Sequence, residues 1–163
     1  MKNYFIGLLI VALMLTASLY YKARRQPPAP GLFPVEESAV QTGTNLHLYF
    51  FFSINSCHDC MEIVEVLNRL QEPFVVIGVV SDLELKDEAL LRKKTGVQFP
   101  LVSNSKYKMY IPRYSPAIVG TSQKGEIFFV MPGVPGEKEY IENFLYGLYY
   151  KLLPYLQKKN SLH

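Results

Sequence analysis

The two cysteines of the chain lie in one tetrapeptide, Cys57-His58-Asp59-Cys60, between an apolar run and a segment with helical periodicity. The preceding run, Leu46 to Phe52, is rich in aromatic residues and predicts a buried strand. Apolar residues then recur at helical spacing, at Ile63, Val66, Leu67 and Leu70. The tetrapeptide therefore marks the point where a strand ends and a helix begins, which is typical of an α/β arrangement.

The position of the cysteines favours thiol chemistry. The first turn of a helix presents unpaired backbone N–H groups and the positive end of the helix dipole, and both stabilise a thiolate. The thiolate is the nucleophile of disulfide exchange. Because only two residues separate the cysteines, their sulfur atoms can meet within one helical turn. We predict that Cys57 is the exposed attacking thiol and that Cys60 is the more buried resolving thiol.

The C-x-x-C spacing also occurs in zinc sites, which need about four ligands. The other histidines, His47 and His163, form no paired ligand motif, so we predict neither a metal site nor another cofactor. A structural disulfide is disfavoured because so short a loop constrains the unfolded chain very little. One alternative stays open, in which the domain is redox-inert and only binds partners, assisting the assembly of a membrane or periplasmic complex.

The two residues between the cysteines affect the thiolate in opposite directions. A protonated His58 stabilises a neighbouring thiolate, although a histidine at an exposed helix start can also have no special role. The carboxylate of Asp59 disfavours the thiolate. Because a more stable thiolate makes a stronger oxidant, this mixed pair predicts a reductase or an isomerase rather than a strong oxidase.

The charge distribution gives no sign of a nucleic-acid surface. The chain has 163 residues and a formal net charge of +3. Four of its 17 basic residues precede residue 26, namely Lys2, Lys22, Arg24 and Arg25, and all 14 acidic residues follow it. With 13 basic residues against 14 acidic ones, the remainder carries a net charge of −1. We therefore predict no nucleic-acid partner.

The N-terminal part of the chain predicts a membrane anchor. Residues 4–21 form an uncharged run of 18 residues, which is long enough to cross a bilayer. Both ends of the run are aromatic, as is common at a membrane interface. We predict a transmembrane anchor over residues 1–21. A signal peptide cleaved near Thr16-Ala17-Ser18 is the alternative, and the bulky residues that follow this segment disfavour it.

The side of the membrane on which the domain lies is predicted differently by two arguments. Lys22, Arg24 and Arg25 follow the anchor, and the positive-inside rule would place them in the cytoplasm. A tethered dithiol domain, however, is expected where disulfides form and are edited. We give precedence to the second argument and predict a single-pass protein of the bacterial cytoplasmic membrane with its domain on the extracytoplasmic side.

A linker and a single domain follow the anchor. The linker covers residues 22–43 and includes the extended Pro-rich segment Gln26–Gly31. The domain covers residues 44–163, about 120 residues, which suffices for a substantial core. Its predicted strands are 46–52, 74–80, 115–119 and 127–131, with a short extended segment at 99–102. Its predicted helices are 57–71, Ser81 or Asp82 to Gly96, and a last one from Glu137 that Pro154 should kink or end. This order predicts a mixed sheet flanked by helices.

The arrangement resembles the thioredoxin fold over residues 44–153. It is most similar to the membrane-tethered redoxins of the TlpA and ResA type, and Cys57 and Cys60 match the redox pair of that family. Pro116 matches its cis-proline, which in the fold faces the cysteines and presents a backbone edge to the substrate. Ser115 would then contact the substrate. The resemblance implies cysteine-containing protein substrates and an upstream thiol that donates electrons.

The chain departs from the family at two positions beside the motif. Family members usually have a tryptophan directly before the first cysteine, whereas this chain has Ser56. Thioredoxins often have a buried acid six residues before that cysteine, where this chain has Phe51. These departures leave the fold intact but remove the expected proton-handling residue. Ile54 takes the place of the threonine typical of peroxiredoxins, so a peroxidase is disfavoured.

Overall fold

The computed structural model describes residues 32–36, 45–56, 60–132 and 138–160. The predicted anchor and Cys57, His58 and Asp59 lie outside these ranges. Among the described residues, no helix is both long enough and apolar enough to cross a membrane. The described elements in chain order are β1 (Leu46–Phe51), η2 (Ile54–Ser56), α2 (Cys60–Arg69), β2 (Phe74–Val80), α3 (Asp82–Leu85), α4 (Glu88–Thr95), β3 (Leu101–Ser103), η3 (Asn104–Tyr107), β4 (Ala117–Thr121), β5 (Ile127–Pro132) and α5 (Lys138–Asn160).

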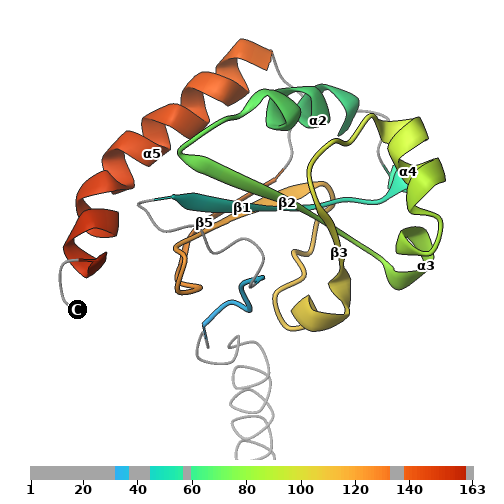
Figure 1. Cartoon of the computed structure of the whole chain (residues 1–163), viewed down its shortest axis with the longest axis horizontal. Coiled ribbons are helices and arrows are strands. Elements are labelled where there is room, and N and C mark those ends of the chain that lie inside the picture. Colours follow the sequence, from blue (N-terminus) through green and yellow to red (C-terminus); the bar gives the residue numbers. More distant parts are fainter. Residues whose placement is uncertain (1–31, 37–44, 57–59, 133–137, 161–163) are drawn as a thin grey trace, which may run out of the picture. The chain divides into compact units, whose positions relative to one another are not determined.

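Five strands form one mixed sheet in the order β3-β2-β1-β4-β5 (Figure 1). β1 pairs in parallel with β2, and β2 pairs in parallel with β3. β4 runs antiparallel to both β1 and β5. The predicted mixed sheet flanked by helices is therefore confirmed. Because β1, β2 and β3 are parallel, their carboxyl ends meet at one edge of the sheet, and at this carboxyl edge the chain leaves β1 for η2, the turn that precedes the cysteine motif.

β1 lies at the centre of the sheet and is buried along its whole length. Its side chains alternate between two apolar clusters, because successive residues of a strand point to opposite faces. Leu48 and Phe50 join a cluster that includes apolar residues of α2, α4 and α5. Tyr49 and Phe51 join a second cluster on the other face, together with Phe33. β1 thus joins the two halves of the core.

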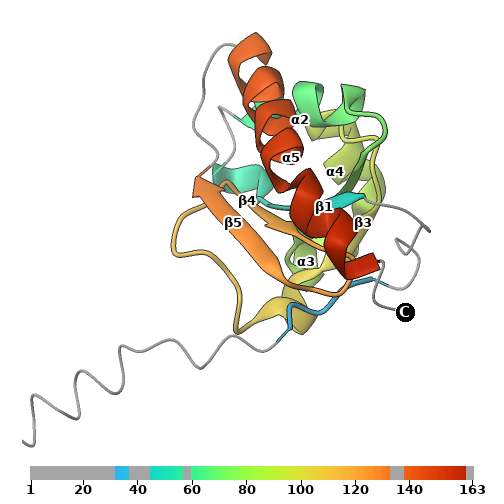
Figure 2. The ribbon, with the colours of Figure 1, turned by 90° about the vertical axis from the view of Figure 1, so that its left-hand side faces the viewer.

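The segment Leu32–Glu36, which falls within the predicted linker, packs against this second face, and we call it the strap (Figure 2). The Phe33 side chain is only 2% exposed, and its ring centroid lies 4.6 Å from that of Tyr49. The Phe33 backbone N–H donates a hydrogen bond of 2.7 Å to the Gly125 carbonyl. Gly125 has a φ of +81°, and a Cβ there would lie 2.1 Å from the Phe33 carbonyl oxygen. A glycine is therefore needed for the strap to dock.

The prediction of one continuous helix from Ser81 or Asp82 to Gly96 is wrong, because two helices, α3 and α4, occupy this range. Ser81 is the N-cap of α3, so that predicted cap is confirmed. α4 has an N-cap of its own, Asp87, whose side chain accepts a hydrogen bond from the Leu90 backbone N–H. An N-cap residue leaves the helical conformation, which explains the break. Gly96 ends α4 with a φ of +74°, as predicted.

Pro154 was expected to kink or end the last helix, and the second of these effects is excluded, since α5 continues through Pro154 to Asn160. A proline inside a helix removes one backbone hydrogen bond and crowds the preceding turn. Leu156, beyond the proline, is buried in the core cluster beneath α5. Burial of this side chain offsets part of the cost of the proline.

Candidate active site at the carboxyl edge of the sheet

The carboxyl edge of the sheet carries a cavity of about 270 Å³. Its walls come from the ends of β1 and β2, from Ser81 and the first turn of α3, and from the segment that leads into β4. The lining includes Phe52, Ser53, Asn55, Glu84 and Ser115. In open α/β sheets, ligands usually bind outside the carboxyl ends of the strands. The cavity is therefore the candidate site, and the cysteine motif directly follows the residues that line it.

The structure places the predicted site residues as follows. Cys60 is the first residue of α2, so a helix does begin within the motif. Ser115 is exposed and lines the cavity. The Ser115–Pro116 peptide bond is cis, as the resemblance implies, and Pro116 directly precedes β4. Cys57, His58 and Asp59 lie outside the described residues. The structure thus brings Ser115 and the backbone leading to the motif to one edge, because β4 pairs with β1.

Glu84 connects α3 to the turn that precedes the motif. One carboxylate oxygen, Oε1, accepts hydrogen bonds from the Ser53 hydroxyl at 2.7 Å and from the Ile54 backbone N–H at 2.8 Å. The other oxygen, Oε2, accepts from the Ser81 hydroxyl at 2.6 Å and from the Ser81 backbone N–H at 3.2 Å. One side chain therefore holds together segments that are some thirty residues apart in the sequence.

Burial disfavours the ionised form of Glu84, but the hydrogen bonds to its carboxylate outweigh this effect. Partial burial alone would raise the pKa of this carboxyl group, whereas the hydrogen bonds from Ser81, Ser53 and the Ile54 backbone lower it. The net effect is a pKa below the ordinary value for glutamate, so Glu84 is an anion at neutral pH. Among the described residues that line the cavity, it is the one charged side chain.

Glu84 is a site residue that was not predicted from the sequence. Its signal was the spacing Ser81-x-x-Glu84, which is the pattern of a capping box and is present as such in α3. The pattern predicts the contact with Ser81. It does not predict the contact with Ser53 and Ile54, because that contact depends on how α3 sits against the end of β1.

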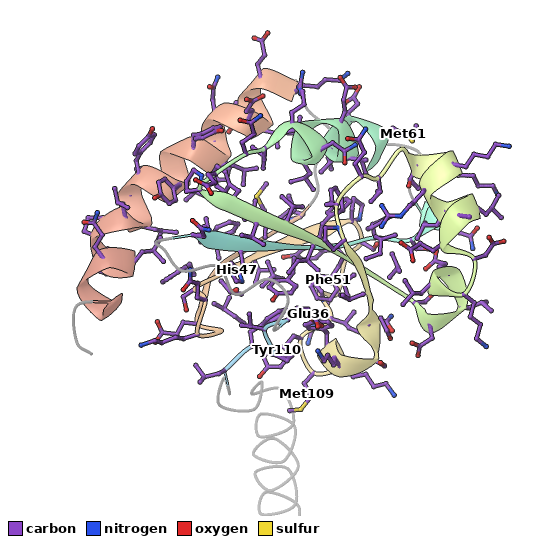
Figure 3. The ribbon with its side chains drawn as sticks, viewed as in Figure 1. Glu36, His47, Phe51, Met61, Met109 and Tyr110 are labelled. Carbon is purple, nitrogen blue, oxygen red and sulfur yellow. The ribbon has the colours of Figure 1, made fainter. Side chains whose placement is uncertain are left out.

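The segment that leads into β4 is held in place by the strap. Glu36 accepts hydrogen bonds from the Tyr107 hydroxyl at 2.7 Å and from the Lys106 ammonium at 2.8 Å. The Tyr110 hydroxyl donates to the Leu32 carbonyl at 3.1 Å. Figure 3 shows Glu36 and Tyr110 on the same side of the sheet as Phe51. Because Ile111, the residue after Tyr110, lines the cavity, the strap supports one of its walls.

These contacts also shift the pKa values of three side chains, those of Glu36, Tyr49 and Tyr107, which we call the strap cluster. Burial alone would raise the pKa of Glu36, but the hydrogen bonds from Lys106 and Tyr107 lower it below its ordinary value. Burial raises the pKa of Tyr49 to about 12, although its hydroxyl accepts a hydrogen bond from the Glu36 backbone N–H. Burial and the neighbouring carboxylate also raise the pKa of Tyr107. At neutral pH the cluster therefore holds one carboxylate and two neutral phenols.

His47 lies at the opposite end of β1 from the candidate site. It is fully buried, and neither ring nitrogen has a hydrogen-bond partner among the described residues. Thr121, opposite it on β4, likewise has a buried hydroxyl without a described partner. Burial lowers the pKa of His47, which keeps the ring neutral. Within the described ranges, no cluster of three or more histidine, cysteine or acidic side chains could hold a metal ion.

Comparison with known proteins identifies the fold. No family model matches the sequence, and no curated protein matches it. Among solved structures, StoA from Bacillus subtilis superposes with a TM-score of 0.51 and 17% identity, over 73% of this chain and 99% of StoA. A secreted disulfide oxidoreductase from Mycobacterium tuberculosis, homologous to E. coli DsbE, has a TM-score of 0.50 and 13% identity, over 68% of this chain and 85% of its own.

A thioredoxin-like protein from Porphyromonas gingivalis superposes with a TM-score of 0.52 and 17% identity, over 79% of this chain and 92% of its own. The chain therefore has the thioredoxin-like fold that its motif order resembles. At these identities the similarity extends to the fold, and the chemistry must be argued from the residues of the site.

Proposed function

We propose that this chain is a membrane-tethered thiol–disulfide oxidoreductase, of the reductase or isomerase type, that acts on cysteines of extracytoplasmic proteins through Cys57 and Cys60. The observation that carries the proposal is the position of this cysteine pair. In the chain it follows the segment, from the end of β1 to Asn55, that lines a cavity at the carboxyl edge of the sheet, and its second cysteine begins α2. The secreted disulfide oxidoreductase from Mycobacterium tuberculosis shows that the thioredoxin-like fold can carry this chemistry outside the cytoplasm.

The proposed reaction proceeds by two thiol–disulfide exchanges. The Cys57 thiolate attacks one sulfur of a substrate disulfide, the S–S bond breaks, and the other substrate sulfur leaves as a thiolate. The Cys60 thiolate then attacks the Cys57 sulfur of this mixed disulfide. The second substrate thiol is released, the substrate is reduced by two electrons, and Cys57 and Cys60 form a disulfide. An upstream thiol donor returns this pair to its reduced form.

Other residues of the site have supporting roles in this proposal. Ser115 and the backbone beside Pro116 contact the extended substrate segment, which the exposure of Ser115 at the cavity supports. His58 and Asp59 adjust the stability of the Cys57 thiolate in opposite directions.

Trapping of substrates tests the proposed chemistry. In the full-length chain, expressed in bacterial membranes, Cys60→Ser should accumulate mixed disulfides with other proteins, because the resolving thiol is absent. The double variant Cys57→Ser/Cys60→Ser is the matched control and should trap nothing. Adducts are measured by non-reducing electrophoresis and disappear on reduction.

The same experiment distinguishes the alternative function. If Cys60→Ser traps no protein, and the wild-type cysteines do not cycle between dithiol and disulfide in a defined glutathione buffer, the chain is a redox-inert binding module. Faster alkylation of Cys60 than of Cys57 in the reduced wild-type chain would reverse the assigned roles of the two cysteines.

A further inference from the structure

The turn η2 is the last described part of the chain before Cys57, and its backbone is fixed by hydrogen bonds from outside the turn. The Ile54 N–H donates to Glu84 at 2.8 Å, and the Asn55 N–H donates to the Ser53 hydroxyl at 3.3 Å. The Ser53 hydroxyl itself donates to Glu84 at 2.7 Å. The first two N–H groups of η2 therefore depend, directly or through Ser53, on one carboxylate oxygen. Turns of this kind lack internal acceptors for these groups.

The capping of α3 does not require this arrangement. A capping box needs one glutamate oxygen to accept from the N-cap backbone, and Oε2 of Glu84 already does so with Ser81. Oε1 is free to point elsewhere and accepts from Ser53 and Ile54. The two oxygens of the carboxylate therefore serve two different elements, and only the Oε1 contacts bear on the approach to Cys57.

The end of β3 is also bonded to the start of α3. The Ser103 hydroxyl, at the end of β3, donates a hydrogen bond to the Asp82 carboxylate in the first turn of α3. The start of α3 is thus anchored to β3 as well as to the end of β1. Figure 1 shows α3 at the end of the sheet where β3 finishes. This anchoring gives Glu84 a fixed position from which to hold η2.

We propose that Glu84 is a positioning residue for the attacking thiol: by holding η2 through Ser53 and Ile54, it fixes the backbone that leads into Cys57. This inference rests on the proposed function. The N–H groups at the start of a helix lower a thiol pKa only if the sulfur lies beside them. Loss of the Glu84 contacts should therefore shift Cys57 toward the behaviour of an ordinary free thiol.

The pH dependence of Cys57 alkylation tests the proposal. The full-length chain in detergent, carrying Cys60→Ser so that Cys57 is its single thiol, is alkylated with iodoacetamide over a range of pH. Glu84→Ala should move the midpoint of the rate upward, toward about 8.5, and slow alkylation at pH 7 by about three- to tenfold. Glu84→Gln, which keeps one acceptor oxygen, should give a smaller upward shift.

Two control variants separate positioning from general stability. Ser81→Ala removes the cap of α3 but leaves the Oε1 contacts, so it should lower the melting temperature without moving the alkylation midpoint. Glu139→Gln changes an exposed carboxylate in the first turn of α5 and should change neither. If Glu84→Ala does not fold, Ser53→Ala tests the same contacts and should reproduce part of the upward shift.

Three results would overturn the inference. An unchanged midpoint in a folded Glu84→Ala chain would mean that Glu84 only stabilises the fold. Equal downward shifts in Glu84→Ala and Glu84→Gln would mean that its charge, and not its hydrogen bonds, acts on Cys57. A wild-type midpoint no lower than that of a free thiol would mean that there is no positioning effect. Alkylation does not require disulfide exchange, so this test remains valid if the proposed function fails.

Discussion

Two half-buried carboxylates, Glu36 and Glu84, organise the candidate site at the scale of single residues. Each accepts hydrogen bonds from a segment distant in sequence, and in each case these bonds outweigh burial and lower the pKa. A carboxylate is suited to this role because it accepts several hydrogen bonds at once, and bonds to a charged group are stronger than neutral ones. Glu84 holds the turn before the motif, and Glu36 holds the strap to η3.

Replacement of Glu36 tests the contribution of the strap cluster to stability. Glu36→Gln should lower the free energy of unfolding at pH 7 by about 1–3 kcal/mol, because Lys106 and Tyr107 lose a charged acceptor. The pKa of Glu36 is lower in the folded chain than in the unfolded chain. Its contribution is therefore complete above about pH 4.3 and is lost as the pH falls through the lower folded value.

Urea unfolding of the two proteins at several pH values measures this difference. The gap between wild type and Glu36→Gln should be largest at pH 7 and should shrink below about pH 4.3. Glu139→Gln, at an exposed position, serves as the control. A gap that stays constant down to low pH would show that the Glu36 charge contributes nothing.

At the scale of elements, docking of the strap depends on the turn between β4 and β5. Gly125 in that turn meets two requirements, a positive φ and a close approach of the Phe33 carbonyl. Gly96, at the end of α4, has a similar positive φ, yet no atom lies within 4 Å of the position that a Cβ would take. The two glycines therefore separate the conformational cost of a side chain from the cost of displacing the strap.

A pair of alanine substitutions uses this contrast. Gly96→Ala should lower the free energy of unfolding by about 1 kcal/mol, the cost of a left-handed non-glycine residue. Gly125→Ala should cost more, by about 1–3 kcal/mol further, because the new Cβ must displace the Phe33 backbone and expose its ring. Urea unfolding measures both values, and limited proteolysis should show new cleavage within 32–36 only in Gly125→Ala. Equal costs would mean that the strap adjusts freely.

At the scale of the whole molecule, the proposed function requires the domain to remain attached to a membrane. The uncharged run of residues 4–21 predicts this attachment, while the positive-inside rule opposes the extracytoplasmic placement.

Fractionation and protease accessibility test this placement. The full-length chain should stay in the membrane fraction after carbonate washing, and protease added to spheroplasts should cleave beyond Arg25. A soluble mature form that begins near Leu19 would identify a cleaved signal peptide instead. Protection of the domain until the cells are lysed would show that the positive-inside rule holds and that the predicted topology is wrong.

Local patterns were sufficient to predict the order of strands and helices along the chain, the mixed sheet and the start of a helix within the cysteine motif. β2 was predicted over its full range, and β1 to within one residue, because burial on both faces leaves a continuous apolar run. That the cysteine motif follows β1 in the chain and leads into α2 could be predicted from the same neighbouring residues. Periodicity is a property of adjacent positions, so it can be recognised before the chain is folded.

Contacts between distant segments depended on the tertiary structure. The strap, the double role of Glu84 and the cavity join residues that are thirty or more positions apart, and they depend on strand order and register. The continuation of α5 through Pro154 has the same cause, since burial of Leu156 offsets a local cost. Local preferences amount to about 1–3 kcal/mol, and packing can override them. The chain therefore encodes its elements locally, whereas the surroundings of the cysteine motif are formed only when the elements pack together.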